Sequence, residues 1–324
     1  MTVLEAVRAA MHEELVRDER VFVIGEDIAS RGGVFLATDG FLEEFGEERI
    51  IDTPLAESSI AGIAMGAAMQ GMRPVAEIQF ADFIWPTMNQ LVGEAARARY
   101  GTEGDVNVPM VIRCPSGGHV RGGLFHSQSV EAYFAHTPGL KVVAPSTPYD
   151  AKGLLKAAIR DNDPVIFLEH KRTYRSVRGQ VPDEEYLLPI GIADIKRTGS
   201  NATLITYGLT VHYSLQAADL LAKEDIEVEV IDLRTIRPLD DNMIMESVRK
   251  TGRVLIVHED NRTGGIGAEL SARISEAAFT DLDAPVMRCT GPDVPAMPFA
   301  PTLEDTFMPT SDKILTALRQ LLEY

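Results

Sequence analysis

The chain has 324 residues, which is enough for two domains that each bury a hydrophobic core. Its formal net charge of −17 argues against a nucleic-acid-binding protein, because few cations are left to pair with phosphates, but suits a basic protein partner. The two cysteines, Cys114 and Cys289, lie far apart, so we expect neither a disulfide framework nor a zinc site, and a reducing compartment is the default.

Residues 1–20 predict an amphipathic helix with Val3, Val7 and Leu15 on one side. The segment carries acidic residues and lacks the apolar centre of a signal peptide. The longest apolar run, around residues 60–69, is too short and too rich in glycine to cross a bilayer. We therefore expect a soluble, cytoplasmic protein that binds neither membrane nor nucleic acid.

Short apolar strands alternate with helices along the rest of the chain. Strands that are apolar on both faces are typical of parallel sheets covered by helices. In the first half, strands are predicted at 21–24, 49–51, 74–80, 110–113, 141–144 and 165–168, and helices at 39–45, 54–71, 88–100 and 150–160. In the second half, strands are predicted at 203–207, 227–232, 253–257 and 285–288, and helices at 211–223, 240–250, 267–279 and 311–322. This order predicts an α/β fold with two domains and mostly parallel sheets.

A polar segment separates the two halves. Residues 171–189 are charged, contain two prolines and show no clear periodicity, so they are the best candidate for a linker. We place the domains at residues 1–185 and 186–324.

The stretch 52–59 leads into a helix that carries almost no polar side chain. Thr53 is a plausible N-cap, Pro54 fits the first helical position, and we expect the helix to be buried on most of its circumference. Glu57 then lies in the first turn. Its carboxylate is either held by the helix N-terminus and solvent, or desolvated and used chemically, and the stretch alone leaves both interpretations open.

Two further stretches carry candidate residues. Residues 78–86 follow a strand and hold aromatics that either stack on a ligand or belong to the core. Residues 115–129 hold four glycines, two histidines and an arginine. Glycine permits close approach to a ligand and His126 can transfer protons near neutral pH, although a plain surface loop has the same composition.

A nucleotide-like glycine cluster at 264–267 does not complete a dinucleotide fingerprint, because Leu270 replaces its third glycine. We expect these glycines to open a helix.

Seven ordered motifs resemble the β subunit of the E1 component of 2-oxo acid dehydrogenase complexes. They are GEDIASRGGVF, DTPLAE, AEIQFADF, GGLFHSQSVEAYFAHTPGLKVV, STPYDAKGLL, DPVIFLEHKRTYR and VIDLRTIRPLD. The likeness covers essentially the whole chain. Within the family, QFADF, HSQS and AHTPGLKVV are most similar to the branched-chain, or 2-oxoisovalerate, enzyme, with pyruvate dehydrogenase a close relative. The resemblance implies a transketolase-like pyrimidine-binding domain and a transketolase C-terminal-like domain that serves dimerisation and E2 docking.

The resemblance also implies roles in binding thiamine diphosphate. Glu57 matches the glutamate that hydrogen-bonds N1′ of the aminopyrimidine and favours the imino form needed to activate the thiazolium. Phe83 matches an aromatic residue stacked on the pyrimidine, and Leu55 and Gln79 match positions near that ring. His126 matches a histidine of the active-site channel, where it either donates a proton during lipoyl acylation or orients the substrate carboxylate.

The sequence lacks the motif that supplies Mg²⁺ ligands in thiamine enzymes. Thiamine enzymes of this kind hold Mg²⁺ at a Gly-Asp-Gly motif, whereas Gly104-Asp105-Val106 departs at its third position. The resemblance implies that an α subunit supplies the Mg²⁺ ligands and shares the cofactor. It also implies a possible K⁺ site formed by backbone near Val111, Ile159, Asp161 and Asp163.

These expectations describe half of a heterotetrameric α2β2 enzyme. The enzyme would oxidatively decarboxylate branched-chain 2-oxo acids and acylate the lipoyl group of E2, binding the subunit-binding and lipoyl domains of E2. The alternatives are a pyruvate or acetoin dehydrogenase β subunit, and a non-catalytic scaffold that docks E2. A scaffold would not need Glu57, Phe83 and His126 together.

Overall fold

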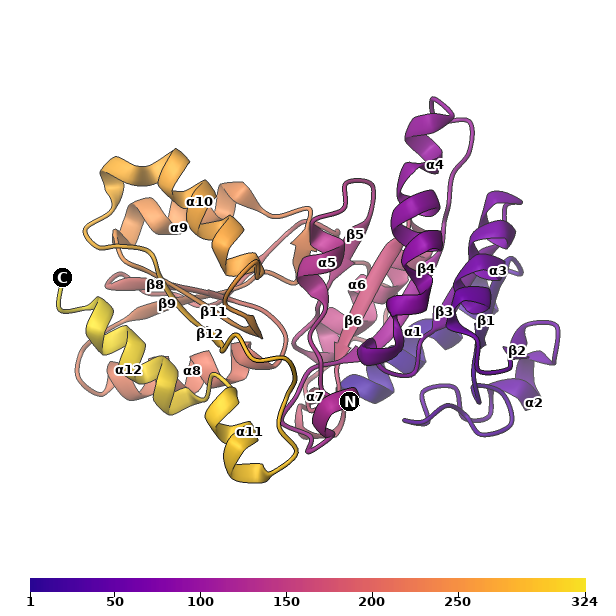
Figure 1. Ribbon diagram of the computed structural model, residues 1–324, viewed down its shortest axis with the longest axis horizontal. Coiled ribbons are helices and arrows are strands. Elements are labelled where there is room, and N and C mark those ends of the chain that lie inside the picture. The colour runs from indigo at the N-terminus through magenta and orange to yellow at the C-terminus, as the bar shows by residue number, and fades with distance from the viewer.

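Two β-sheets, each covered by helices on both faces, form two lobes that lie side by side (Figure 1). The computed structural model describes residues 1–324. No helix combines the length and the apolar character needed to cross a bilayer.

The first sheet has seven strands in the order β10-β5-β6-β4-β3-β1-β2. All neighbours are parallel except β10, which is antiparallel to β5. The strands are β1 Val21–Gly25, β2 Ile50–Asp52, β3 Arg73–Glu77, β4 Val111–Ser116, β5 Lys141–Val143, β6 Val165–His170 and β10 Thr235–Arg237. The helices of this lobe are α1 Val3–Arg17, α2 Phe41–Phe45, α3 Glu57–Met69, α4 Ala96–Gly101, α5 Glu131–Ala135, α6 Pro148–Arg160 and α7 Thr173–Ser176.

The alternation of side chains in a strand explains the two layers of helices around this sheet. In β1, Val21 and Val23 join the core under α1 and α6, whereas Phe22 and Ile24 join the core under α3. Local signals start the helices: Thr2 and Glu5 form a reciprocal capping box at α1.

The second sheet has five strands in the order β12-β11-β8-β9-β7, parallel except for the β7 edge. These strands are β7 Asp194–Arg197, β8 Ala202–Thr206, β9 Val228–Asp232, β11 Val254–Asn261 and β12 Met287–Gly291. The helices are α8 Leu209–Ala222, α9 Asp241–Thr251, α10 Ile266–Ala278, α11 Pro301–Phe307 and α12 Ser311–Leu321. Helices α8 and α12 pack against one face, while α9 and α10 cover the other.

The lobes share structure across their boundary. Strand β10 follows β9 in the second half of the chain yet pairs with β5 of the first sheet. The core under α3 continues without a break into the residues under α9 and α10. The start of the expected linker is also ordered, because α7 buries Thr173 and Tyr174. The division at residues 185 and 186 stays a prediction.

Several element bounds differ from those predicted. Helix α3 begins at Glu57 with Ala56 as N-cap, so Thr53 and Pro54 do not cap or start it. It is also not buried on most of its circumference: Ile60 is buried, but Ile63 is 53% exposed. The expected helix at 88–100 is a π-helical segment, Asn89–Ala95, followed by α4.

Candidate active site

The candidate residues lie at the carboxyl edge of the first sheet. Neighbouring parallel strands β1, β3, β4 and β6 end at Gly25, Glu77, Ser116 and His170. The chain that leaves these ends carries Glu26, Gln79, Phe83, His126 and Lys171. Ligands of open α/β sheets bind at this edge, so topology gathers residues that are far apart in sequence.

Glu57 is the first residue of α3 and is half-buried. It lies near a second acid: the pKa of Glu26 is raised by burial and by the negative charges of Asp27 and Glu57. The amide Nε2 of Gln79 donates to the Glu26 backbone oxygen at 3.2 Å. Glu57, Glu26 and Gln79 therefore form the polar side of the site.

An aromatic corner forms the other side. The His126 ring meets Phe80 edge-on at 4.6 Å between centroids, and Phe83 edge-on at 5.4 Å. Phe80 and Phe83 lie 5.8 Å apart, also edge to face. Such pairs favour defined ring orientations. The predicted residues Phe83 and His126 are thus brought into contact, with His126 exposed at its tip.

Asp82 ties the aromatic segment to the loop that carries His126. Its two carboxylate oxygens accept hydrogen bonds from the backbone amides of Ser127 and Gln128, each at 3.3 Å. Burial raises the pKa of Asp82, although these amides oppose the shift.

Lys171 is a residue that the motif analysis passed over. Its Nζ is buried without a hydrogen-bond partner and lies 5.8 Å from the Phe80 ring centroid. Burial lowers the pKa of Lys171 to about 8, against the favourable charges of Asp82 and Glu259. The only sequence signal for it is its place directly after β6.

Leu55 does not join this cluster in the structure. Its side chain is 71% exposed, on the segment that enters α3. The role of Leu55 beside the pyrimidine ring stays a prediction, and it requires that a partner chain cover this side chain.

Two of the backbone oxygens considered for potassium accept hydrogen bonds from a protein cation. One guanidinium nitrogen of Arg73 donates to the backbone oxygens of Ile159 and Asp161, both at 2.9 Å. The carboxylate of Asp163 pairs with Arg99 at 2.7 Å and with Lys141 at 3.1 Å. The K⁺ site stays a prediction. Val111 lies in the β4 ladder between β3 and β6.

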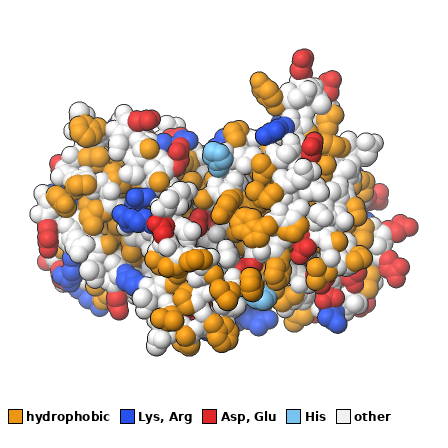
Figure 2. Space-filling model, viewed as in Figure 1, with side chains coloured by type: hydrophobic (Ala, Val, Ile, Leu, Met, Phe, Trp, Pro, Cys, Tyr) orange, Lys and Arg blue, Asp and Glu red, His pale blue; other side chains and the backbone are white.

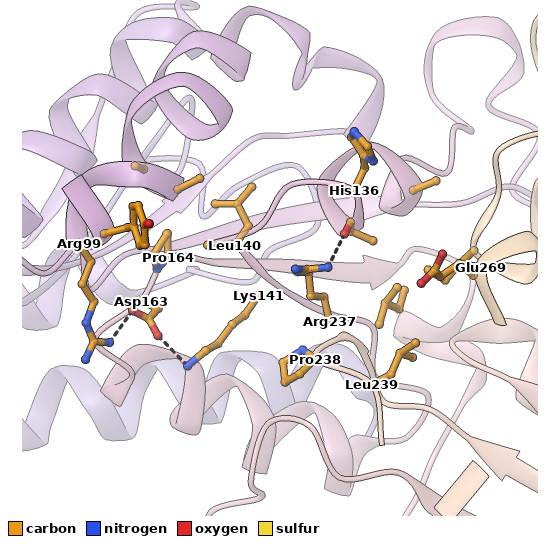
Figure 3. Close-up of a pocket in the computed structure, with 18 of the residues that line it drawn as sticks. Arg99, His136, Leu140, Lys141, Asp163, Pro164, Arg237, Pro238, Leu239 and Glu269 are labelled. Carbon is orange, nitrogen blue, oxygen red and sulfur yellow. Dashed lines mark hydrogen bonds and ion pairs between the residues drawn. The ribbon is translucent and has the colours of Figure 1, made fainter. Parts of the chain in front are cut away.

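A cavity of about 1540 Å³ lies elsewhere, between the two lobes (Figure 3). It is lined by Arg99, Lys141, Arg237 and Glu269, among others, and the only predicted site residue in its lining is Asp163. The candidate site is instead an open face. Hydrophobic side chains gather over the region of α11 (Figure 2). Phe125 and Phe299 are among the exposed aromatic side chains, at 66% and 71%.

Comparison with known proteins identifies the family. The model of the transketolase pyrimidine-binding domain matches residues 1–177, and that of the transketolase C-terminal domain matches residues 191–314. The 2-oxoisovalerate dehydrogenase subunit beta of Bacillus subtilis is 59% identical over 324 residues, covering 100% of this chain and 99% of that protein. This chain belongs to the E1 β-subunit family of 2-oxo acid dehydrogenases.

Other E1 β subunits align over the same length. The pyruvate dehydrogenase E1 component subunit beta is 49% identical in Bacillus subtilis and 46% identical in Staphylococcus epidermidis, each covering 100% of this chain and 99% of the relative. A solved structure titled "Split gene transketolase, inactive beta4 tetramer" superposes with a TM-score of 0.81 at 21% identity, covering 100% of this chain and 98% of that one. That likeness supports the fold alone.

Membership in the E1 β family confirms the expected two-domain α/β architecture. It also implies the use of thiamine diphosphate and work within an E1 complex that pairs α with β subunits and acts with E2. The roles of individual residues follow as proposals.

Proposed function

We propose that this E1 β chain forms an α2β2 enzyme that oxidatively decarboxylates branched-chain 2-oxo acids and acylates E2-bound lipoyl groups. The observation that carries the proposal is the placement of the Glu57 carboxylate and the Phe83–His126 aromatic corner at one edge of the first sheet.

The residues present fit one end of thiamine diphosphate. A carboxyl group at the start of α3 suits a ring nitrogen, and the face of Phe83 suits a flat heterocycle. When bound, the cofactor supplies the carbon that attacks the 2-oxo group. This chain contributes the groups around the ring: Glu57 shares a proton with the ring nitrogen, Gln79 lines the site, and Phe83 orients the ring.

Glu26 is a second acid beside Glu57. Burial raises the pKa of the Glu26 carboxyl, and the negative charges of Asp27 and Glu57 raise it further. We assign the exchange of a proton with the ring nitrogen to Glu57, because it begins α3 at the edge of the sheet where ligands bind.

His126 is placed at the entrance. It is exposed, yet the edges of Phe80 and Phe83 fix its ring orientation. We assign it the proton that the departing lipoyl thiolate needs, with orientation of the substrate carboxylate as the alternative role.

The exposed surface supports a partner chain. Leu55, two residues before Glu57, and Ile63 of α3 are exposed, as is Phe125, which directly precedes His126. An α subunit covering this face would exclude water from the site and supply the Mg²⁺ ligands for the diphosphate. The net charge of −17 suits a basic subunit-binding domain of E2.

The substrate is tested with the reconstituted enzyme. The relative at 59% identity is named for 2-oxoisovalerate and that at 49% for pyruvate. We expect kcat/KM of the co-expressed α and β chains with E2 to favour 2-oxoisovalerate over pyruvate by about tenfold or more. An equal or opposite preference would favour the pyruvate enzyme, and retained turnover in Glu57→Ala would favour a scaffold.

A further inference from the structure

The loop 117–126, called here the His126 loop, has an unusual backbone. Positive φ angles recur at alternate residues, namely Gly117, His119, Arg121 and Gly123. Residues other than glycine rarely adopt this conformation, because the side chain crowds the backbone. His119 at φ 60° and Arg121 at φ 61° therefore need contacts from outside the loop to hold them.

Glu304 of the second lobe supplies such a contact. It lies on α11 and its side chain is fully buried. Its Oε1 accepts hydrogen bonds from the backbone amides of Val120 at 3.2 Å and Arg121 at 3.1 Å. Its Oε2 accepts one from the Arg121 guanidinium at 2.5 Å. Successive amides that converge on one anion form a nest, and this nest is filled by a side chain of the other lobe.

Glu259 of β11 binds the start of the His126 loop and also Ser129, three residues after His126. Its Oε1 accepts hydrogen bonds from the Gly118 amide at 2.8 Å and the Ser129 hydroxyl at 2.7 Å. Its Oε2 pairs with His170 Nε2 at 2.7 Å. Burial opposes ionisation, but His170 and these donors outweigh it and lower the pKa of Glu259 to about 2.

The first lobe holds the loop less closely on the far side of His126. The amides of Ser127 and Gln128 reach Asp82 at 3.3 Å, which is longer than the bonds to Glu259. Both lobes therefore hold the segment around His126, the first through Asp82, Phe80 and Phe83 and the second through Glu259 and Glu304.

We propose that Glu304 is a positioning residue for His126, so that α11 of the second lobe fixes the geometry of a catalytic site in the first. The inference rests on the proposed function only for the role of His126. The contact of Glu304 with the loop rests on its hydrogen bonds and does not depend on the proposed function.

Hydrogen exchange of the purified chain tests the contact directly. In Glu304→Ala the amides of Val120 and Arg121 should exchange about tenfold faster than in the native chain, since their acceptor is gone. Glu229→Gln is the matched control, because Glu229 is equally buried but binds Ser247 and Lys250 within its own lobe. Unchanged exchange of the loop in Glu304→Ala, or equal acceleration in Glu229→Gln, would overturn the proposal.

Kinetics of the reconstituted enzyme test the consequence. We expect Glu304→Ala to lower the kcat of lipoyl acylation by up to about 100-fold while decarboxylation with an artificial electron acceptor changes less. Because Glu304 acts through His126, the Glu304→Ala substitution should cause no further loss of acylation rate in a chain that already carries His126→Ala. Losses that multiply in the double variant would overturn the proposal. Glu304→Gln, which keeps an oxygen for the two amides, should restore part of the rate and replaces Glu304→Ala if that variant does not fold.

Failure of the proposed function and failure of the positioning role of Glu304 can be told apart. If the native α and β pair does not decarboxylate any 2-oxo acid, the proposed function fails, and the exchange experiment still decides whether Glu304 holds the loop. If the native pair is active and the Glu304 variants acylate normally, only the positioning role fails.

Discussion

Glu57 is held at the start of α3 beside Glu26 and Gln79, and its substitution should separate chemistry from folding. In Glu57→Gln the shape is kept but the proton can no longer be shared, so turnover of the reconstituted enzyme should fall by about 100-fold or more. The exchange rate of the cofactor C2 proton, followed by NMR, should fall in parallel. Exposed Glu47→Gln is the control, and near-native exchange in Glu57→Gln would refute the assignment.

His126 should affect one half-reaction more than the other. In His126→Ala, decarboxylation measured with an artificial electron acceptor should survive better than acylation of lipoyl-E2, because only the second step needs a proton for the departing thiolate. His136→Ala provides a control, since His136 is exposed and lines the remote cavity. Equal loss of both activities would assign His126 to the substrate carboxylate instead.

At the level of single residues, the sequence predicted the site where motifs are contiguous and missed it where contacts are long-range. Glu57, Phe83 and His126 stand in recognisable motifs, and the structure places Phe83 and His126 in contact. Glu304 lies 178 positions after His126, in a helix that the hydrophobic pattern did not predict. Only the folded chain shows that its carboxylate fills a nest of backbone amides.

Among the elements, helix α3 has an apolar face that no other part of this chain covers. Ile60 and Ala64 pack into the core, while Ile63 faces outward and a Cβ added at Gly66 would contact no other atom. The sequence indicated burial on most of the circumference of this helix, and an apolar face without a cover is the physical reason for the difference. A partner surface would complete the burial.

A charge on that face should weaken assembly without unfolding the chain. Ile63→Glu should leave the Tm of the isolated β chain within about 2 °C, since exposed substitutions change stability little. It should weaken binding of the α subunit by about tenfold or more, because a charge would be buried unpaired. Val16→Glu on α1, 65% exposed, is the control. A thermal melt of the isolated β chain measures the Tm, and calorimetric titration with α measures the affinity. A native-like affinity of Ile63→Glu would place the interface elsewhere.

Element prediction succeeded where buried strands are long enough to show a pattern. Strand β1 and the first four residues of β6 appear as unbroken apolar runs. By contrast, β10 has three residues and exists only because β5 lies beside it. The segment 88–100 has a helical pattern, but its hydrogen bonds widen into a π-helical stretch over Asn89–Ala95.

Across the whole molecule, buried carboxyl groups join the two lobes and make stability depend on pH. The hydroxyl of Tyr207 donates to Glu131 at 2.7 Å across the boundary. Burial and the nearby charge of Asp260 raise the pKa of Glu131 to about 8 from its ordinary 4.5. The native state therefore holds a proton that the unfolded chain has lost, so this group's contribution falls as pH rises through that interval.

Glu131→Gln should remove this dependence, because the amide mimics the protonated acid. The free energy of unfolding, measured by urea titration between about pH 5 and 8, should fall less steeply with pH in the variant than in the native chain. Glu47→Gln again serves as the control. Parallel curves for Glu131→Gln and the native chain would show that Glu131 is ionised in the fold.

The central claim is that this chain holds half of an active centre and that an α subunit completes it. The most direct measurement is decarboxylation of 2-oxoisovalerate, with thiamine diphosphate and Mg²⁺ present, by the β chain alone, by α alone and by both together. We expect turnover, and tight retention of the cofactor, only when both chains are present. A β chain that binds the cofactor tightly and decarboxylates the substrate unaided would contradict the account.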